Sequence, residues 1–278
     1  MKSSMQPSKL LVTAIMFIFG VIFLMPFIWM LSTSFKVEAD VFKFPIEWIP
    51  STWNVLDNYN QVWNGKYPFV LYYLNTIKVT VITTILSVSI SSMAAYGFSK
   101  VQFSGKEIIF IIVLATYMVP PEAFLVPQFI LYRWLGLFDS HLGLILLNSF
   151  SVLGTFMLRQ FFMGIHNEFI ESAKIDGASH IRIFRSIAFP LVLPAIATYA
   201  ILRFIWTWND YKYALIFLKS DHNYTLQLAV RKFADAYGGQ TYSLIMACAV
   251  SAIIPLLIVF IVGQKQIIEG IALGGVKG

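Results

Sequence analysis

The sequence predicts an all-α polytopic membrane protein with six transmembrane helices. Three observations support this fold class: 58% of the 278 residues are hydrophobic, only 12% are charged, and the apolar residues fall in long blocks. A soluble domain carries about 25% charged residues, so water cannot be the only solvent of this chain. The whole chain, residues 1–278, is expected to form a single membrane domain in contact with lipid.

Six apolar segments are long enough to cross a bilayer, whose core of about 30 Å needs about 20 helical residues. The first, at about 10–35, has no charged residue. It exceeds the apolar region of a cleaved signal peptide, which has about 7–15 residues, so we interpret it as a span. The other five are expected at about 73–99, 108–132, 142–162, 190–217 and 243–264.

The distribution of Lys and Arg predicts that both termini are cytoplasmic. With that orientation the inner segments carry ten basic residues and the outer segments seven. Basic residues accumulate on the cytoplasmic side of membrane proteins. The loop 166–189, between the fourth and fifth spans, and the C-terminal tail 265–278 are then cytoplasmic.

The loop 166–189 has the pattern of two short helices around a turn. Glu168–Ile175 predicts the first helix, Asp176-Gly177 supplies the turn, and Ser179 is typical of the cap of a second helix. The second helix is amphipathic, with Ile181, Phe184, Ile187 and Ala188 on its apolar side. From the pattern alone, an amphipathic hairpin resting on lipid headgroups remains an alternative.

This loop resembles the EAA motif, E-A-A-x3-G-x9-I-x-L-P, of bacterial ABC importer permeases. Ser172 and Phe189 depart from the motif but remain small and apolar, respectively. The resemblance implies that the loop couples the permease to its ATPase, with Glu171 pairing with a basic group there and Gly177 allowing a sharp turn. The residues implied in coupling are Glu171, Ser172, Ala173, Gly177, Ile181, Phe184, Ile187 and Pro190, with Ile181 and Phe184 filling an apolar cleft of the ATPase.

Fragments along the rest of the chain are similar to MalG-type permeases of bacterial carbohydrate importers. They include Asn75-Thr76, Ala95-Tyr96-Gly97-Phe98, Val119-Pro120, Trp208-Asn209-Asp210 and the terminal Gly274-Gly275-Val276-Lys277-Gly278. The resemblance implies a multi-pass subunit of the bacterial cytoplasmic membrane. It also implies a second homologous permease, two ABC ATPase subunits that bind ATP and Mg, an extracytoplasmic solute-binding protein, and a sugar substrate, specifically an oligosaccharide. No cofactor is expected in this chain itself.

Prolines affect the third span, and glycines affect the C-terminal tail. Pro120 and Pro121 are expected to kink the third span, because proline removes a helical hydrogen bond and clashes with the preceding turn. The tail contains Gly270, Gly274 and Gly275, which predict backbone freedom. By resemblance, this tail reaches between the ATPase subunits.

Polar and aromatic residues in or near the spans are candidates for a substrate path. A charge at mid-bilayer costs about 2.5–3.5 kcal/mol on insertion scales, so such groups need a partner or water. Aromatic faces stack on sugar rings, and amides bond sugar hydroxyls. The candidates are Tyr117, Glu122, Asn148, Arg203, Trp206, Trp208, Asn209 and Asp210. A structural ion pair for Arg203, and interfacial positions for Asp210 and the tryptophans, are the alternatives.

No pattern indicates catalysis, a metal site or nucleic-acid binding. The segment nearest to a P-loop, Lys100–Glu107, lacks the first glycine and the final Ser or Thr. The four histidines are scattered and there is one cysteine, so no ligand cluster is predicted. A membrane-embedded enzyme and half of a secondary transporter remain alternatives from other classes. Within the ABC class, the alternatives are permeases for polyamines, phosphonates or glycerol phosphate.

Overall fold

The structure is a computed structural model that describes residues 7–236 and 241–275. These residues form helices, and their only β-type pairing is an isolated antiparallel bridge between Lys36 and Trp53. The chain divides into two compact units. The first unit is Met1–Val70 with Ala229–Ile254, and the second unit is Leu71–Leu228 with Pro255–Gly278.

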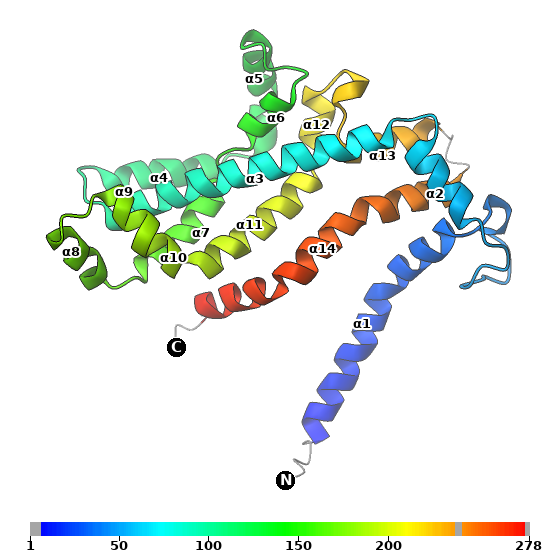
Figure 1. The fold of residues 1–278 in the computed structure, drawn as a ribbon, viewed down its shortest axis with the longest axis horizontal. Helices are drawn as coiled ribbons and strands as arrows, with labels where there is room; N and C mark the ends of the chain where they lie inside the picture. Colours follow the sequence, from blue (N-terminus) through cyan, green and yellow to red (C-terminus); the bar gives the residue numbers. More distant parts are fainter. Residues whose placement is uncertain (1–6, 237–240, 276–278) are drawn as a thin grey trace. The chain divides into compact units, whose positions relative to one another are not determined.

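Up to six membrane spans are present among the described residues (Figure 1). Three are single helices of sufficient length and hydropathy: α1 (Pro7–Ser34), α3 (Phe69–Lys100) and α14 (Tyr242–Gly275). The other three are pairs of helices that are bent at a short break. This arrangement confirms the predicted all-α polytopic fold.

The segment expected as the third span consists of two helices. α4 (Lys106–Tyr117) and α5 (Pro121–Trp134) are bent by 95° at the break between them. Pro121 occupies the first turn of α5, a position that tolerates the missing N–H of proline. The predicted kink is therefore confirmed, but the bend is too large for 108–132 to form one continuous helix.

The fourth span is also bent, by 46°, between α6 (His141–Leu147) and α7 (Val152–Met163). Serines cap both helices: Ser140 Oγ accepts the Gly143 N–H, and Ser151 Oγ accepts the Gly154 N–H, each at 3.0 Å. Such caps satisfy backbone donors that the first turn of a helix leaves unpaired.

The expected fifth span, 190–217, is interrupted twice. Pro190 lies in the short helix α10 (Phe189–Leu191), before an 81° bend that leads into α11 (Leu193–Trp208). α11 ends at Trp208, and α12 (Lys212–Phe217) begins only after Tyr211. Asp210 Oδ1 accepts the Tyr213 N–H at 3.1 Å, a local side-chain bond of the kind that competes with continued helix.

The expected tail is largely helical. α14 continues past the predicted end at residue 264 to Gly275, so Gly270 and Gly274 lie within the helix. A single glycine costs a helix only about 1 kcal/mol, and this segment has no proline to stop it. Residues 276–278 lie outside the described residues.

The first unit is held together by buried polar contacts. Lys36 is fully buried, with Nζ donating to the Glu47 carbonyl at 2.5 Å and lying over the Trp29 ring. Asn58, in α2 (Val55–Asn64), donates to the carbonyls of Ser34 and Lys36. Because buried polar groups are costly when unpaired, these bonds fix how the segment after α1 folds back.

The second unit has a core formed by α3, α7 and α11 and covered by the loop 166–189. Tyr199 of α11 is buried, and its hydroxyl lies 2.8 Å from Ser87 Oγ of α3. Gly154 of α7 makes room for the Tyr199 ring, since a Cβ at this position would lie 2.2 Å from a ring carbon. α3, α7 and α11 therefore meet at one closely packed point.

Candidate functional site

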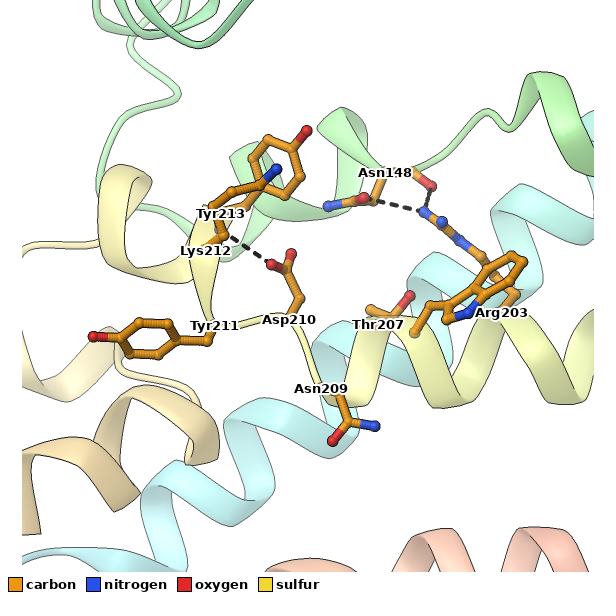
Figure 2. A pocket seen from close by; sticks show the side chains of 9 residues that line it. Asn148, Arg203, Thr207, Asn209, Asp210, Tyr211, Lys212 and Tyr213 are labelled. Carbon is orange, nitrogen blue, oxygen red and sulfur yellow. Dashed lines mark hydrogen bonds between the residues drawn. The ribbon is translucent and has the colours of Figure 1, made fainter. Parts of the chain in front are cut away.

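A cavity of about 470 Å³ lies in the second unit at the C-terminal end of α11 (Figure 2). Ligand pockets commonly have about 300–1,000 Å³, so the cavity is large enough for a small organic ligand. It is lined by Asn148, Arg203, Trp206, Thr207, Asn209, Asp210, Tyr211, Lys212 and Tyr213.

Four segments of the second unit supply the lining. Arg203, Trp206 and Thr207 come from the last turns of α11, where a spacing of three or four residues places side chains on one face. The break at residues 209–211 supplies polar and aromatic side chains, and α12 begins at Lys212. Asn148 follows α6 directly. The break after α11 thus allows residues that are neighbours in the sequence to surround one cavity.

Arg203 is anchored by Asn148, and Figure 2 shows its guanidinium pointing at this residue. Arg203 Nη2 donates to the Asn148 backbone carbonyl and, at 3.2 Å, to Asn148 Oδ1. Arg203 and Asp210 also interact electrostatically. A half-buried guanidinium needs such partners because its desolvation is expensive.

A second pair of opposite charges joins the cavity to α5. Lys212 Nζ lies 2.9 Å from Glu122 Oε1, with side chains 44% and 65% exposed, respectively. Glu122 belongs to the first turn of α5, where a carboxylate also favours the positive end of the helix dipole. The candidate Glu122 is therefore linked to the cavity only through Lys212.

Asp139 fixes the segment before α6 to the segment after α12. Its carboxylate accepts the N–H groups of Lys219 and Ser220 at 2.9 and 3.0 Å, and the Ser220 hydroxyl. Asn223 Nδ2 donates to the Asp139 carbonyl at 2.7 Å. Burial by itself raises the pKa of Asp139, but these bonds outweigh it and hold the pKa well below its usual 3.8. The wall that carries Asn148 is thus tied to α12.

Five of the eight predicted path residues meet at this cavity: Asn148, Arg203, Trp206, Asn209 and Asp210. Trp208 does not, because it is 1% exposed and packs against Tyr73 and Phe204. Tyr117 is 59% exposed at the end of α4 and is not part of the lining.

Sequence reasoning missed four lining residues: Thr207, Tyr211, Lys212 and Tyr213. A signal was present in the run Trp206–Tyr213, which combines aromatic, amide and charged side chains within a segment otherwise rich in apolar residues. Such a mixture is typical of irregular backbone that lines a wet cavity rather than lipid.

The loop 166–189 has the predicted local structure. α8 (Asn167–Ile175) is followed by Gly177 with φ +76°, and Ser179 Oγ accepts the Arg182 N–H at 3.4 Å as the cap of α9 (His180–Ile183). The left-handed φ explains the glycine, since a side chain is strained there. An added Cβ at Gly177 would meet nothing within 4 Å, so contacts within this chain do not require a glycine.

The expected apolar face of the second helix needs correction. Ile183 is 1% exposed and belongs to the core, whereas Ile181 is 67% exposed. Phe184 packs against Tyr96 and Phe162 and is not free to fill a partner's cleft. A π-helical turn, η2 (Phe184–Ala188), follows α9. Phe184, Ile187 and Ala188 nevertheless pack on the core as the predicted apolar side requires, so Ile181 is the member of that side that the structure contradicts.

Exposed apolar residues on the loop differ in part from those predicted. Phe169 and Ile175 of α8 are 52% and 87% exposed and join Ile181 as uncovered apolar side chains. Glu171 and Ser172 are exposed as well, whereas Ala173 is buried. Neighbouring Ile170 is buried in the core, so α8 has one face on the core and another uncovered.

Lys100 ties the loop to the end of α3. Its Nζ donates to the Ile165 carbonyl at 2.6 Å and to Asn167 Oδ1 at 2.9 Å. α11 starts beside the loop and ends at the cavity, a distance of about 24 Å at 1.5 Å per residue. The loop and the cavity therefore lie at opposite ends of the same helix.

No group of three or more potential metal ligands occurs among residues 7–236 and 241–275. The single cysteine, Cys248, is buried.

Comparisons with known proteins identify the family. The model of the binding-protein-dependent transport system inner membrane component matches residues 87–271, which include the cavity lining and the loop. The arabinooligosaccharides transport system permease protein AraQ of Bacillus subtilis (strain 168) is 32% identical, over 97% of this chain and 96% of that protein.

Two solved structures share the fold. One is a bacterial ABC transporter involved in importing the acidic polysaccharide alginate: TM-score 0.83, 27% identity, covering 95% of this chain and 99% of that chain. The other is a bacterial alginate ABC transporter in complex with an alginate pentasaccharide-bound periplasmic protein: TM-score 0.66, 14% identity, covering 93% and 94% of the two chains. This chain belongs to the binding-protein-dependent transport system inner membrane component family, and it is an ABC importer permease whose role is transport rather than catalysis.

Proposed function

We propose that this permease carries an oligosaccharide across the bacterial inner membrane. It would act with a second homologous permease, two ABC ATPase subunits that bind ATP and Mg, and an extracytoplasmic solute-binding protein. Both of its termini would lie in the cytoplasm. The observation that carries the proposal is the cavity at the end of α11.

The lining of the cavity suits a sugar. Trp206, Tyr211 and Tyr213 offer aromatic faces, of which Trp206 is 45% and Tyr211 37% exposed. Asn148 and Asn209 add amides, and Thr207 adds a hydroxyl. Sugar rings have apolar faces and a rim of hydroxyls, so aromatic surfaces and convergent polar groups match both parts of the ligand.

The relatives support a carbohydrate over the other solutes considered. One is named for arabinooligosaccharides and another for the polysaccharide alginate. Both substrates are chains of sugar units, although alginate is acidic. A polyamine permease would be expected to place uncompensated acids along the path, whereas Glu122 is paired with Lys212 here and Asp210 interacts electrostatically with Arg203 and Lys212.

We further propose that the loop 166–189 docks onto an ATPase. The support is its uncovered surface: Phe169, Ile175 and Ile181 are exposed apolar side chains, and Glu171 of the same loop is an exposed carboxylate. The segment His180–Leu191 is bent by 81° from α11, a direction suited to lying along a membrane surface. Exposed apolar clusters of this kind mark sites of protein contact.

The proposal is tested by uptake into a strain that lacks the chain. The native gene is expected to restore uptake of labelled neutral or uronic oligosaccharides, but not of spermidine or glycerol 3-phosphate. Arg203→Gln is expected to lower that uptake by about tenfold or more, because removing one member of a desolvated polar pair costs several kcal/mol. Uptake of spermidine or glycerol 3-phosphate alone would contradict the sugar assignment.

The same experiment separates the cavity from the rest of the permease. Arg203→Gln is compared with Arg133→Gln, which changes an exposed arginine outside the lining. Both variants are first checked for equal amounts in the membrane fraction. Undiminished uptake with Arg203→Gln would mean that the cavity is not on the substrate path.

A further inference from the structure

The charges at the cavity are arranged in two opposite pairs. Arg203 and Asp210 attract one another electrostatically across the lining, and Lys212 lies 2.9 Å from Glu122. Among the described lining residues Arg203 and Lys212 are the only cations, and their charges are balanced by Asp210 of the lining and Glu122 of α5. The site therefore has no net charge with which to attract an anionic or a cationic ligand.

Two buried polar atoms of the lining also lack a partner. In the part of the chain that the structure describes, Thr207 Oγ1 and Arg203 Nε make no hydrogen bond. Thr207 is only 8% exposed. Unpaired buried polar atoms are uncommon because each costs free energy. A sugar hydroxyl brought within reach by a small shift of the lining would satisfy both atoms, since it accepts a hydrogen bond from Nε and both donates to and accepts from a threonine.

A carboxylate on the sugar would interact less favourably with this lining than a hydroxyl. It would satisfy Arg203 Nε but would also bring a negative charge to the wall that carries Asp210, and Figure 2 places Asp210 between Asn148 and Lys212. Lys212 offers little compensation while Glu122 holds it. Like charges that share a site repel, and the repulsion grows as water is excluded.

We propose that this cavity selects an uncharged saccharide, and that Glu122 and Asp210 set the selectivity by balancing the positive charges of Lys212 and Arg203. The inference rests on the proposed sugar transport and narrows its substrate class. It makes Glu122 and Asp210 specificity-determining residues whose neutralisation leaves a net positive cavity. Such a cavity would accept uronic acids, which carry one carboxylate per sugar.

The test compares ligands that differ only in charge. The intact importer, purified with its partner subunits in nanodiscs and without the binding protein, is titrated with galactotriose and with trigalacturonate. A gluco-configured pair, cellotriose and the corresponding glucuronic trisaccharide, is measured in parallel. Binding is followed by saturation-transfer NMR competition, which reports on weak ligands. The native importer is expected to prefer the neutral member of at least one pair.

Two variants then test the residues. Glu122→Gln and Asp210→Asn are each expected to shift relative affinity toward the uronic acid by about three- to fivefold, the size of one partly exposed charge interaction. Asp210→Asn keeps an oxygen for the Tyr213 N–H, and Glu122 is exposed, so both variants are compatible with the fold. Asp57→Asn removes an exposed acid on α2 and changes the net charge by the same amount, so it should leave the relative affinity unchanged.

The outcomes separate this inference from the proposed function. Binding of neutral and uronic sugars with equal affinity, or unchanged ratios in both variants, would overturn the selectivity while leaving sugar transport in place. If none of the four trisaccharides binds the native importer and uptake of oligosaccharides also fails, the proposed function falls and the inference falls with it.

Discussion

Asp139 shows how one carboxylate supports a site that it does not touch. It precedes α6, adopts a left-handed φ of 56°, and gathers hydrogen bonds from Lys219, Ser220 and Asn223 on the far side of α12. A carboxylate that accepts several N–H and O–H groups is strongly stabilised in its charged form. The contact fixes the distance between Asn148 and the residues of α12.

Replacing Asp139 by asparagine tests this support. Asparagine tolerates the left-handed φ, so the change removes mainly the charge. The free energy of unfolding at pH 7 is expected to fall by about 1–2 kcal/mol, because hydrogen bonds to an ionised acceptor are stronger than those to a neutral one. Melting of the purified protein in detergent measures the effect, with Asp57→Asn as the surface control.

The difference between native protein and Asp139→Asn should depend on pH. The folded-state pKa of Asp139 lies below the unfolded value of about 3.8, so its stabilisation is present above that value and is lost as pH falls through the folded pKa. The two melting temperatures are therefore expected to approach one another as the pH falls from about 4 toward about 2. A gap that stays constant over this range would contradict the assigned charge state.

Individual side chains differ in how far the sequence predicted their roles. Arg203 was a candidate because a charge within an apolar helix requires a polar partner, and Asn148 because amides bond sugar hydroxyls. Their contact with one another was not predicted. Lys212 was missed, since its pairing with Glu122 depends on the 95° bend that turns α5 away from α4. Trp208 was expected on the path but is buried. Composition does not tell which face of α11 a tryptophan occupies.

The packing of α7 against α11 depends on the absence of a side chain at Gly154. Gly154→Ala would place a Cβ about 2.2 Å from the Tyr199 ring, so one of the helices must move. We expect a loss of about 1–3 kcal/mol in stability, the usual cost of overpacking a core. Arg203 lies one turn beyond Tyr199, so the displacement would also weaken the hydrogen bonds between Arg203 and Asn148. Sugar uptake should therefore fall as well.

Two comparisons control this experiment. Gly97→Ala in α3 adds the same methyl group where nothing lies within 4 Å, and it should be neutral or slightly stabilising. In the double variant Gly154→Ala with Tyr199→Ala, the loss of stability should be smaller than the sum of the two single losses. Removing the Tyr199 ring also removes the clash with the new Cβ. Equal stability of Gly154→Ala and Gly97→Ala would refute the tight contact.

Helices were predicted better than their interruptions. The apolar lengths of α1 and α3 predicted these elements, and proline at 120 and 121 correctly predicted a kink, although not its size. The end of α11 at Trp208 was not foreseen, because it rests on local bonds such as Asp210 to Tyr213 rather than on proline or glycine. Likewise, nothing in the 3.6-residue period indicated the π turn at Phe184–Ala188.

Across the second unit, α11 connects the two regions that an importer must coordinate. The cavity lies at its C-terminal end, and the loop 166–189 packs around its N-terminal end through a shared core. Ala188 and Tyr199 both belong to that core. A force applied to the loop would therefore reach the cavity through packed helices rather than through a flexible linker. This arrangement suits a subunit driven by a separate ATPase.

The measurement that tests this account most directly is mass spectrometry of the proteins that co-purify with the tagged chain from its native host. Native protein is compared with Gly177→Val and with the control Gly136→Val. Both glycines have φ near +70° and open space around an added Cβ, so the two changes impose similar backbone strain. Only Gly177 belongs to the proposed docking loop.

The account predicts a second permease and an ATPase with the native chain and with Gly136→Val. In Gly177→Val the ATPase should be lost while the second permease is retained and the amount in the membrane is unchanged. The contrary result would be a native chain that purifies without an ATPase, or an ATPase that stays bound in Gly177→Val as firmly as in the control. The loop would then be an amphipathic hairpin at the lipid surface and not the coupling element.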